Sequence, residues 1–324
     1  MTALQGLIKP DKGNKFSFFS GKGGVGKTTM SSATAVWLAD QGYKTLLFST
    51  DLQKSTNDIF QQHIGLDPTP INGVANLWGV SIEVVETLKR HEGKMVDILK
   101  VIDSESVFVK EYTTEIEHPE ECNCEKAALF EFMKYLGKGG DQYDAIVFDT
   151  APTGQQLEII RSSVNYTLNL ASQVEHKKKL VEYFGKEEAE AQIKGLEERR
   201  DTEERAVKNL GGDHTCFVMI LYPEEMPLAE VERNTGFLGW VFNIPVRAVI
   251  INNIIPEHET VGNAFWTKRK DMQKKYIDLT YEKFPDKVIA PVPMMATEVI
   301  GVERLRKVGA HLYGGNGAAG WGGK

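Results

Sequence analysis

The stretch that decides the fold reads Ser20-Gly21-Lys22-Gly23-Gly24-Val25-Gly26-Lys27-Thr28-Thr29. A short apolar segment, Phe16–Phe19, precedes it, and a segment with a helical pattern, Thr28–Ala39, follows it. A strand, a glycine-rich loop and a helix in this order form the context that a phosphate-binding loop requires. The stretch therefore predicts a nucleotide-binding α/β domain, and a glycine turn without a ligand is the alternative.

Each residue type in the loop suits phosphate binding. Glycines let the backbone approach phosphates closely, and the N–H groups at a helix N-terminus supply positive potential. Lys27 is expected to reach the β- and γ-phosphate oxygens, and the Thr28 hydroxyl is expected to bind Mg²⁺. ATP and Mg²⁺ are therefore the predicted cofactors. The predicted loop contacts are Gly21, Lys22, Gly23, Gly24, Val25, Gly26, Lys27, Thr28 and Thr29.

Composition excludes several classes of protein. A net charge of −7 and a pI near 5.6 disfavour a nucleic-acid groove, which needs clustered positive charge. Three cysteines in 324 residues cannot form a disulfide framework, and we see no N-terminal apolar stretch of signal-peptide length. No run approaches the roughly 18 apolar residues of a membrane span. We therefore expect a cytoplasmic protein that binds no nucleic acid.

Apolar runs without polar alternation predict strands that are buried on both faces. The runs are Phe16–Phe19, Thr45–Ser49, Leu77–Ile82, Ala145–Phe148, Cys216–Leu221, Ala248–Ile251 and Val288–Val292. Helical patterns separate them, which predicts a doubly wound, mostly parallel sheet. Two charged, helical stretches at about 84–137 and 161–212 are expected to form an inserted helical subdomain. We expect one composite domain over 1–324, with a disordered glycine-rich tail at 314–324.

Two acidic residues follow predicted strands at the edge where ligands bind in such sheets. Asp149 opens the segment Asp149-Thr150-Ala151-Pro152-Thr153-Gly154, and its position beside the phosphate loop suits a carboxylate that binds Mg²⁺ through water. A plain helix cap is the alternative for Asp149. Asp51 follows Ser49-Thr50 at the end of another strand, where a turn residue is the alternative.

These motifs resemble those of the arsenite-pump and tail-anchored-protein-targeting ATPases, a family distantly similar to the nitrogenase iron protein. The resemblance implies an ATP-hydrolysing homodimer in which Lys22 reaches the nucleotide of the partner subunit. A solvated surface lysine is the alternative for Lys22. The resemblance also implies that the segment after Asp149 senses the γ-phosphate and that Asp51 orients the attacking water. Lys22, Lys27 and Asp51 are therefore the predicted catalytic residues.

The chain departs from the family pattern in both switch loops. Leu52-Gln53-Lys54-Ser55 stands where the family has Pro-Ala-His-Ser, and Gln155-Gln156 replaces the family histidine. Glu158 stands where the family usually has arginine. We expect these changes to leave phosphate and magnesium binding intact. They put in question the rate of ATP hydrolysis and the trigger of closure.

Further matches extend the resemblance from about residue 14 to residue 313. Glu224 stands where a family glutamate reaches the nucleotide across the dimer, with a solvated loop acid as the alternative. Asn252 matches an asparagine that reads adenine, since an amide can both donate and accept at a base edge. Pro293 and Met294 match the loop that lines the adenine pocket. Strand capping for Asn252 and ordinary core packing for Met294 are the alternatives.

The cysteines bear on the cargo. Targeting ATPases often carry a zinc-binding Cys-x-x-Cys pair before the segment that corresponds to 268–276, but no cysteine follows Cys216 here. Cys122 and Cys124 fall instead near the position of a metalloid-binding cysteine in the arsenite pumps. Paired thiolates at a two-fold axis would suit a soft metal or metalloid ion. Two exposed cysteines without a ligand are the alternative.

The sequence thus predicts a dimeric ATPase that couples ATP-driven closure to cargo handling, with a soft, arsenite-like ion at Cys122 and Cys124 as the favoured cargo. A targeting factor that carries a hydrophobic helix, with a membrane-protein partner, is the first alternative. Only Met95 and Met133 lie in the two helical stretches, whereas methionine-rich linings are typical of adaptable apolar grooves. A scaffold that binds ATP with little hydrolysis is the second alternative.

Overall fold

The computed structural model describes residues 2–50, 55–82, 131–150, 153–184 and 187–314. This part of the chain contains a sheet of eight strands in the order β3-β4-β2-β5-β1-β6-β7-β8. The strands are β1 Phe16–Gly21, β2 Thr45–Ser49, β3 Thr69–Pro70, β4 Leu77–Ser81, β5 Ala145–Asp149, β6 Thr215–Leu221, β7 Val246–Ile254 and β8 Val288–Pro293. All neighbours pair in parallel except β3 and β4. The predicted α/β fold with a mostly parallel sheet is confirmed.

The centre of the sheet is buried on both faces, as its apolar sequence requires. Phe18 of β1 stacks between Phe148 of β5 and Phe217 of β6, with ring centroids 4.4 Å and 4.3 Å apart. Aromatic pairs of this kind add about 0.5–1.5 kcal/mol beyond the area that they bury. This ladder ties β1 to its two neighbours in the sheet, β5 and β6.

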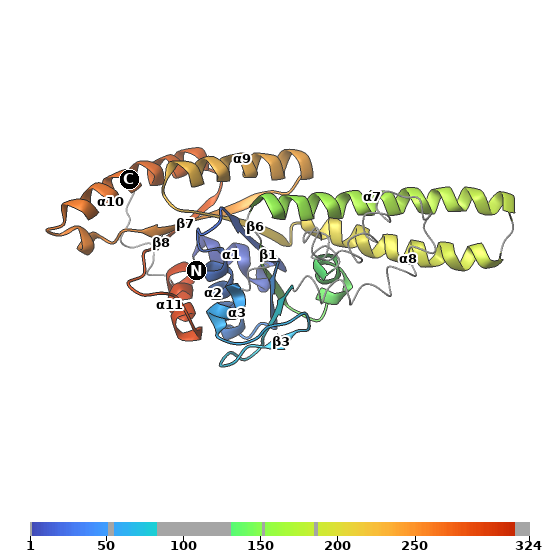
Figure 1. Cartoon of the computed structure of the whole chain (residues 1–324), viewed down its shortest axis with the longest axis horizontal. Helices are drawn as coiled ribbons and strands as arrows, with labels where there is room; N and C mark the ends of the chain where they lie inside the picture. Colours follow the sequence, from blue (N-terminus) through green and yellow to red (C-terminus); the bar gives the residue numbers. More distant parts are fainter. Residues whose placement is uncertain (1, 51–54, 83–130, 151–152, 185–186, 315–324) are drawn as a thin grey trace, which may run out of the picture. The chain divides into compact units, whose positions relative to one another are not determined.

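Helices cover both faces of the sheet (Figure 1). Those of the sheet-bearing unit are α1 Ala3–Ile8, α2 Lys27–Asp40, α3 Ser55–Phe60, α9 Glu225–Phe242, α10 Ala264–Lys283 and α11 Val302–Tyr313. Helix α2 is buried nearly all round, with ten of its fourteen residues in the core. Helix α11 packs on it, since the rings of Trp37 and Tyr313 stack 4.0 Å apart. The helix that follows the loop is therefore held firmly in the domain.

The described chain groups into two compact units, and the second comprises the described parts of 82–142 and 157–210. Helices α7 Thr153–Phe184 and α8 Glu187–Leu210 supply most of it, and residues 131–136 are also helical. The predicted helical insertion at 161–212 is confirmed, with α7 beginning eight residues earlier. Most of the other predicted stretch, 84–137, lies outside the described residues, as does the tail from residue 315.

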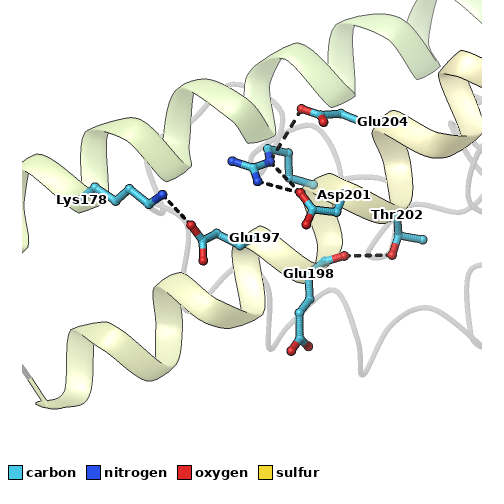
Figure 2. Close-up of polar contacts among 7 residues, drawn as sticks. Lys178, Glu197, Glu198, Asp201, Thr202 and Glu204 are labelled. Carbon is cyan, nitrogen blue, oxygen red and sulfur yellow. Dashed lines mark hydrogen bonds and ion pairs between the residues drawn. The ribbon is translucent and has the colours of Figure 1, made fainter.

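An ion pair joins the two long helices, and two further pairs lie within α8. Lys178 of α7 lies 2.5 Å from Glu197 of α8, and Arg200 pairs with Asp201 and Glu204 along α8 (Figure 2). Exposed pairs of this kind contribute about 0–1 kcal/mol each, so these contacts mark a solvated surface. None of the described helices is long and apolar enough to span a membrane.

Candidate functional site

The predicted site residues that the structure describes lie at the carboxyl ends of neighbouring parallel strands. The phosphate loop follows β1, Asp149 ends β5, and Asn252 lies near the end of β7. Phe19 is in register with Asp149, and Gly21 is in register with Ile220 of β6. This edge of an open parallel sheet is where ligands bind. The fold thus brings together residues that are more than two hundred positions apart.

Two glycines of the loop are fixed by their surroundings. A Cβ at Gly21 would lie 2.3 Å from the Ile220 carbonyl oxygen of the neighbouring strand. Gly26, the residue before α2, has φ +96°, and a Cβ there would lie 2.5 Å from Nδ2 of Asn252. Side chains rarely adopt this backbone region. Glycine at these positions therefore lets the chain leave β1 and enter α2 within a few residues.

The donors of the loop converge on one point. Lys27 is 7% exposed, and its Nζ donates to the Lys22 carbonyl oxygen at 3.2 Å. The Val25 N–H donates to the same oxygen at 3.4 Å. An ammonium and a backbone N–H directed at one oxygen at the start of a helix form an arrangement suited to phosphate oxygens. The Thr28 and Thr29 side chains are half-buried beside it.

Asp149 is fully buried and surrounded by hydroxyl groups. Its Oδ2 accepts hydrogen bonds from Ser49 Oγ at 3.4 Å and from Thr56 Oγ1 at 3.3 Å. Thr150, the next residue, donates to the Phe19 carbonyl oxygen at 2.7 Å, which ties β5 to β1. A carboxylate held in this way beside the phosphate loop has the chemistry of a magnesium site, because Mg²⁺ prefers oxygen ligands.

The described residues contain no group of three or more His, Cys, Asp or Glu side chains that could hold a metal ion. Mg²⁺ bound together with a nucleotide needs no such group, since phosphate oxygens and waters complete its coordination. Thr28 and Asp149 fit this ion as one hydroxyl and one carboxylate. The candidate soft-ion ligands, Cys122 and Cys124, lie outside the described residues, and so does Asp51.

Asn252 is 7% exposed, and its amide already has backbone partners. Nδ2 donates to the Val25 carbonyl oxygen at 2.9 Å, and Oδ1 accepts from the Asn253 N–H at 2.8 Å. Asn253 itself has φ +58°, a conformation that asparagine tolerates better than most residues. The structure thus connects Asn252 to the loop, and its predicted contact with adenine stays a prediction.

Glu224, Pro293 and Met294 lie after or at the carboxyl ends of two strands, β6 and β8. Glu224 precedes α9, and its Oε1 accepts a hydrogen bond from Arg269 of α10 at 2.8 Å. Pro293 ends β8, and the Met294 N–H donates to the Ile254 carbonyl oxygen at 2.8 Å. All three side chains are half-buried, so they are accessible to a ligand. Their nucleotide contacts stay predictions, as does the reach of the half-buried Lys22 to a partner subunit.

Sequence reasoning missed Tyr222 as a site residue. Its hydroxyl donates to the Gly24 carbonyl oxygen at 2.8 Å. Burial, and then the nearby Glu224 carboxylate, raise the pKa of Tyr222, so it keeps its proton near neutral pH. The available signal was its place directly after the strand 215–221, at the edge where ligands bind. Tyrosine is common beside strands for packing reasons, so this position alone did not distinguish it.

Comparisons with known proteins agree with the motifs. Residues 14–314 match the anion-transporting ATPase family. The chain is 33% identical over 304 residues to a protein of Aquifex aeolicus provisionally named an arsenical pump-driving ATPase, covering 91% of this chain and 98% of that protein. It is 31% identical over 306 residues to ATPase GET3A of Arabidopsis thaliana, covering 90% of this chain and 82% of that protein.

A third relative is longer. A protein of Halobacterium salinarum, also provisionally named an arsenical pump-driving ATPase, is 30% identical over 318 residues, which cover 97% of this chain and 46% of that protein. The chain therefore spans less than half the length of this relative. The matches confirm the resemblance inferred from the motifs: the chain belongs to the anion-transporting ATPase family and is an ATPase of that family.

Proposed function

We propose that this chain is a magnesium-dependent ATPase that works as a cytoplasmic homodimer and couples closure around ATP to the handling of a soft metal or metalloid ion. The observation that carries the ATP-dependent part is the convergence of the Lys27 ammonium and the Val25 N–H beside the buried Asp149. Each of these groups suits one part of a nucleoside triphosphate that is bound with Mg²⁺.

Phosphoryl transfer depends mainly on positioning and on stabilisation of negative charge. The buried Lys27 places its charge on the phosphates, where low dielectric strengthens the interaction. When Mg²⁺ is bound with ATP, the Thr28 hydroxyl would be its protein ligand, and Asp149 would hold it through a water. The ion would supply neutralisation of the negative charge on the phosphates. Asp51 orients the attacking water, a role that rests on the family resemblance.

Dimerisation is part of the proposal because of Lys22. The assignment of its half-buried side chain to the phosphates of a partner subunit rests on the family resemblance. We expect Lys22→Ala to lower the turnover rate while leaving nucleotide affinity of the monomer nearly unchanged. Calorimetric titration with ADP and a steady-state rate at several protein concentrations measure both. Equal loss of affinity in a dimer-disrupted variant would contradict the role across an interface.

The favoured cargo rests on the spacing of Cys122 and Cys124 and on the named function of two relatives as arsenical pump-driving ATPases. A tail-anchored helix as cargo is the second candidate. The described side chains of α7 and α8 favour it less, since Leu168 is the large apolar residue that they leave exposed. Identities of 33% and 31% to relatives of the two kinds do not choose between the cargoes.

Melting curves with arsenite, with zinc or without addition test the ion cargo. A ligand that binds the folded dimer should stabilise it by about 2.7 kcal/mol at a free concentration one hundred times its dissociation constant. The Cys122→Ser/Cys124→Ser variant should lose this shift. Identical curves for both proteins under all conditions would overturn the ion cargo, and co-purification with a hydrophobic helix would then support the second candidate.

The ATPase site has a test of its own. A Lys27→Ala variant that hydrolyses ATP at the wild-type rate would contradict it.

A further inference from the structure

Two successive carbonyl groups of the phosphate loop accept hydrogen bonds from side chains of other strands. The Gly24 oxygen accepts from the Tyr222 hydroxyl at 2.8 Å, and the Val25 oxygen accepts from Asn252 Nδ2 at 2.9 Å. Tyr222 directly follows β6, and Asn252 belongs to β7. The middle of the loop is therefore held from two strands that are distant in sequence.

A held carbonyl also fixes the direction of an N–H. Within a planar trans peptide, the C=O of one residue and the N–H of the next point in opposite directions. Fixing the Gly24 carbonyl toward Tyr222 thus directs the Val25 N–H to the opposite side. That is the side of the Lys22 oxygen, which also accepts from Lys27 Nζ. Tyr222 thereby aims one donor of the loop at the point where the lysine charge also lies.

Packing does not hold Gly23 and Gly24 in place. Both residues are exposed, and a Cβ added at either one would meet no atom within 4 Å. Val25, the next residue, is buried in the core with 2% of its surface exposed. The Tyr222 hydrogen bond therefore restrains the peptide on its Gly24 side, while packing restrains it on its Val25 side. Tyr222 is itself well placed, because the Glu224 N–H donates to its carbonyl oxygen at 2.7 Å and the following Pro223 is buried.

We propose that Tyr222 is a positioning residue of the ATPase site, which orients the Val25 N–H of the phosphate loop through the Gly24 carbonyl. This inference rests on the proposed binding of ATP at the loop. It makes the segment after β6 part of the phosphate site, in addition to any contact of Glu224 with nucleotide. The ligand class that this arrangement suits is a compound with a phosphate chain, because the Val25 N–H that Tyr222 orients belongs to the phosphate loop.

The test is Tyr222→Phe, which keeps the ring and removes the hydroxyl. We expect the dissociation constant for ADP and the KM for ATP to rise about 2- to 12-fold, the equivalent of one ordinary hydrogen bond. The value of kcat should change less, because a loop contact that is equally strong in the bound and the reacting complex alters binding more than the chemical step. The melting temperature without nucleotide should stay within 1–2 degrees of wild type, roughly the effect of a surface change.

Tyr281→Phe is the matched control, because Tyr281 of α10 is 47% exposed and should give wild-type constants. Adenosine, which lacks phosphates, should inhibit Tyr222→Phe and wild type equally. Equal ADP binding by Tyr222→Phe and wild type would overturn the inference alone. A matching loss for adenosine would also overturn it, since Tyr222 would then act on the nucleoside. Failure of the wild type to bind ADP would overturn the proposed function together with the inference.

Discussion

The amide nitrogen of Asn252 lies 2.9 Å from the Val25 carbonyl oxygen and only 2.5 Å from the position that a Cβ on Gly26 would occupy. One side chain of β7 thus donates a hydrogen bond to the phosphate loop at Val25. The same side chain leaves room only for glycine at the next position, Gly26. The contact joins residues 227 positions apart in the chain. It makes the loop conformation a property of the assembled sheet.

Gly26→Ala should therefore disrupt the loop. A left-handed conformation at a residue with a side chain costs about 1–3 kcal/mol, and the overlap with Asn252 adds to this cost. If the loop shifts to relieve it, ADP affinity should fall about 5- to 150-fold, as measured by calorimetric titration. Gly236→Ala is the matched control, since a Cβ at Gly236 in α9 meets nothing within 4 Å. Wild-type ADP affinity in Gly26→Ala would contradict this account.

Asp149→Asn should impair magnesium-dependent hydrolysis of ATP while leaving nucleotide binding without Mg²⁺ nearly unchanged. The substitution keeps the shape of the buried side chain and removes its charge, so Mg²⁺ loses its carboxylate partner while the loop keeps its own contacts. The hydrolysis rate should fall by about 10²-fold or more, whereas ADP affinity without Mg²⁺ should change little. A magnesium titration of phosphate release measures the first effect. Lys12→Asn, at an exposed position, is the control, and unchanged magnesium dependence in Asp149→Asn would refute the assignment.

Cys216 should make the free energy of unfolding depend on pH in the alkaline range. Burial raises the pKa of its thiol from 9.0 to about 12. The unfolded chain releases this proton above its lower pKa while the folded chain retains it, so the stabilisation is full below about pH 9 and is lost as pH rises toward 12. Between pH 8 and pH 10.5 the loss should be roughly 1–2 kcal/mol.

Urea unfolding of wild type and Cys216→Ala at both pH values measures this loss. The variant has lower stability throughout because of the cavity, but its decline from pH 8 to pH 10.5 should be smaller than that of the wild type. The Cys216 charge also raises the pKa of Tyr313, after burial as the main cause. The difference between the two declines therefore measures the thiol together with its coupling to Tyr313. Parallel declines would show that the thiol does not contribute.

Tyr313 should affect stability without affecting the nucleotide site. The Thr34 hydroxyl donates to the Met30 carbonyl oxygen at 2.7 Å, so the Tyr313 hydroxyl, also 2.7 Å from Thr34 Oγ1, is the donor between the two. Tyr313→Phe removes this buried bond between α11 and α2 and should cost about 1–3 kcal/mol of unfolding free energy. Its KM for ATP should equal that of the wild type, in contrast to Tyr222→Phe. A changed KM would show that α2 transmits the loss to the loop.

Local sequence was sufficient for most of the sheet. The run Thr45–Ser49 has the bounds of β2, because an uninterrupted apolar segment between polar turns is buried over its whole length. The edge strand Thr69–Pro70 escaped prediction, since two residues carry no periodicity and one of them is proline. Helix α7 begins at Thr153, within the segment that follows Asp149, whose proline and glycine gave no helical pattern in the sequence.

The loop chemistry, the family and every strand except β3 could be read from the amino-acid sequence, because these depend on neighbours in the chain. Which of the residues after the strands meet one another depends on the folded sheet. Strand order in the sheet is not sequence order, because β1 lies between β5 and β6, and β7 then follows β6. This arrangement places Tyr222 on Gly24 and Asn252 on Val25, 198 and 227 positions apart. Contacts over such separations are set by the packing of the whole sheet, which no local pattern encodes.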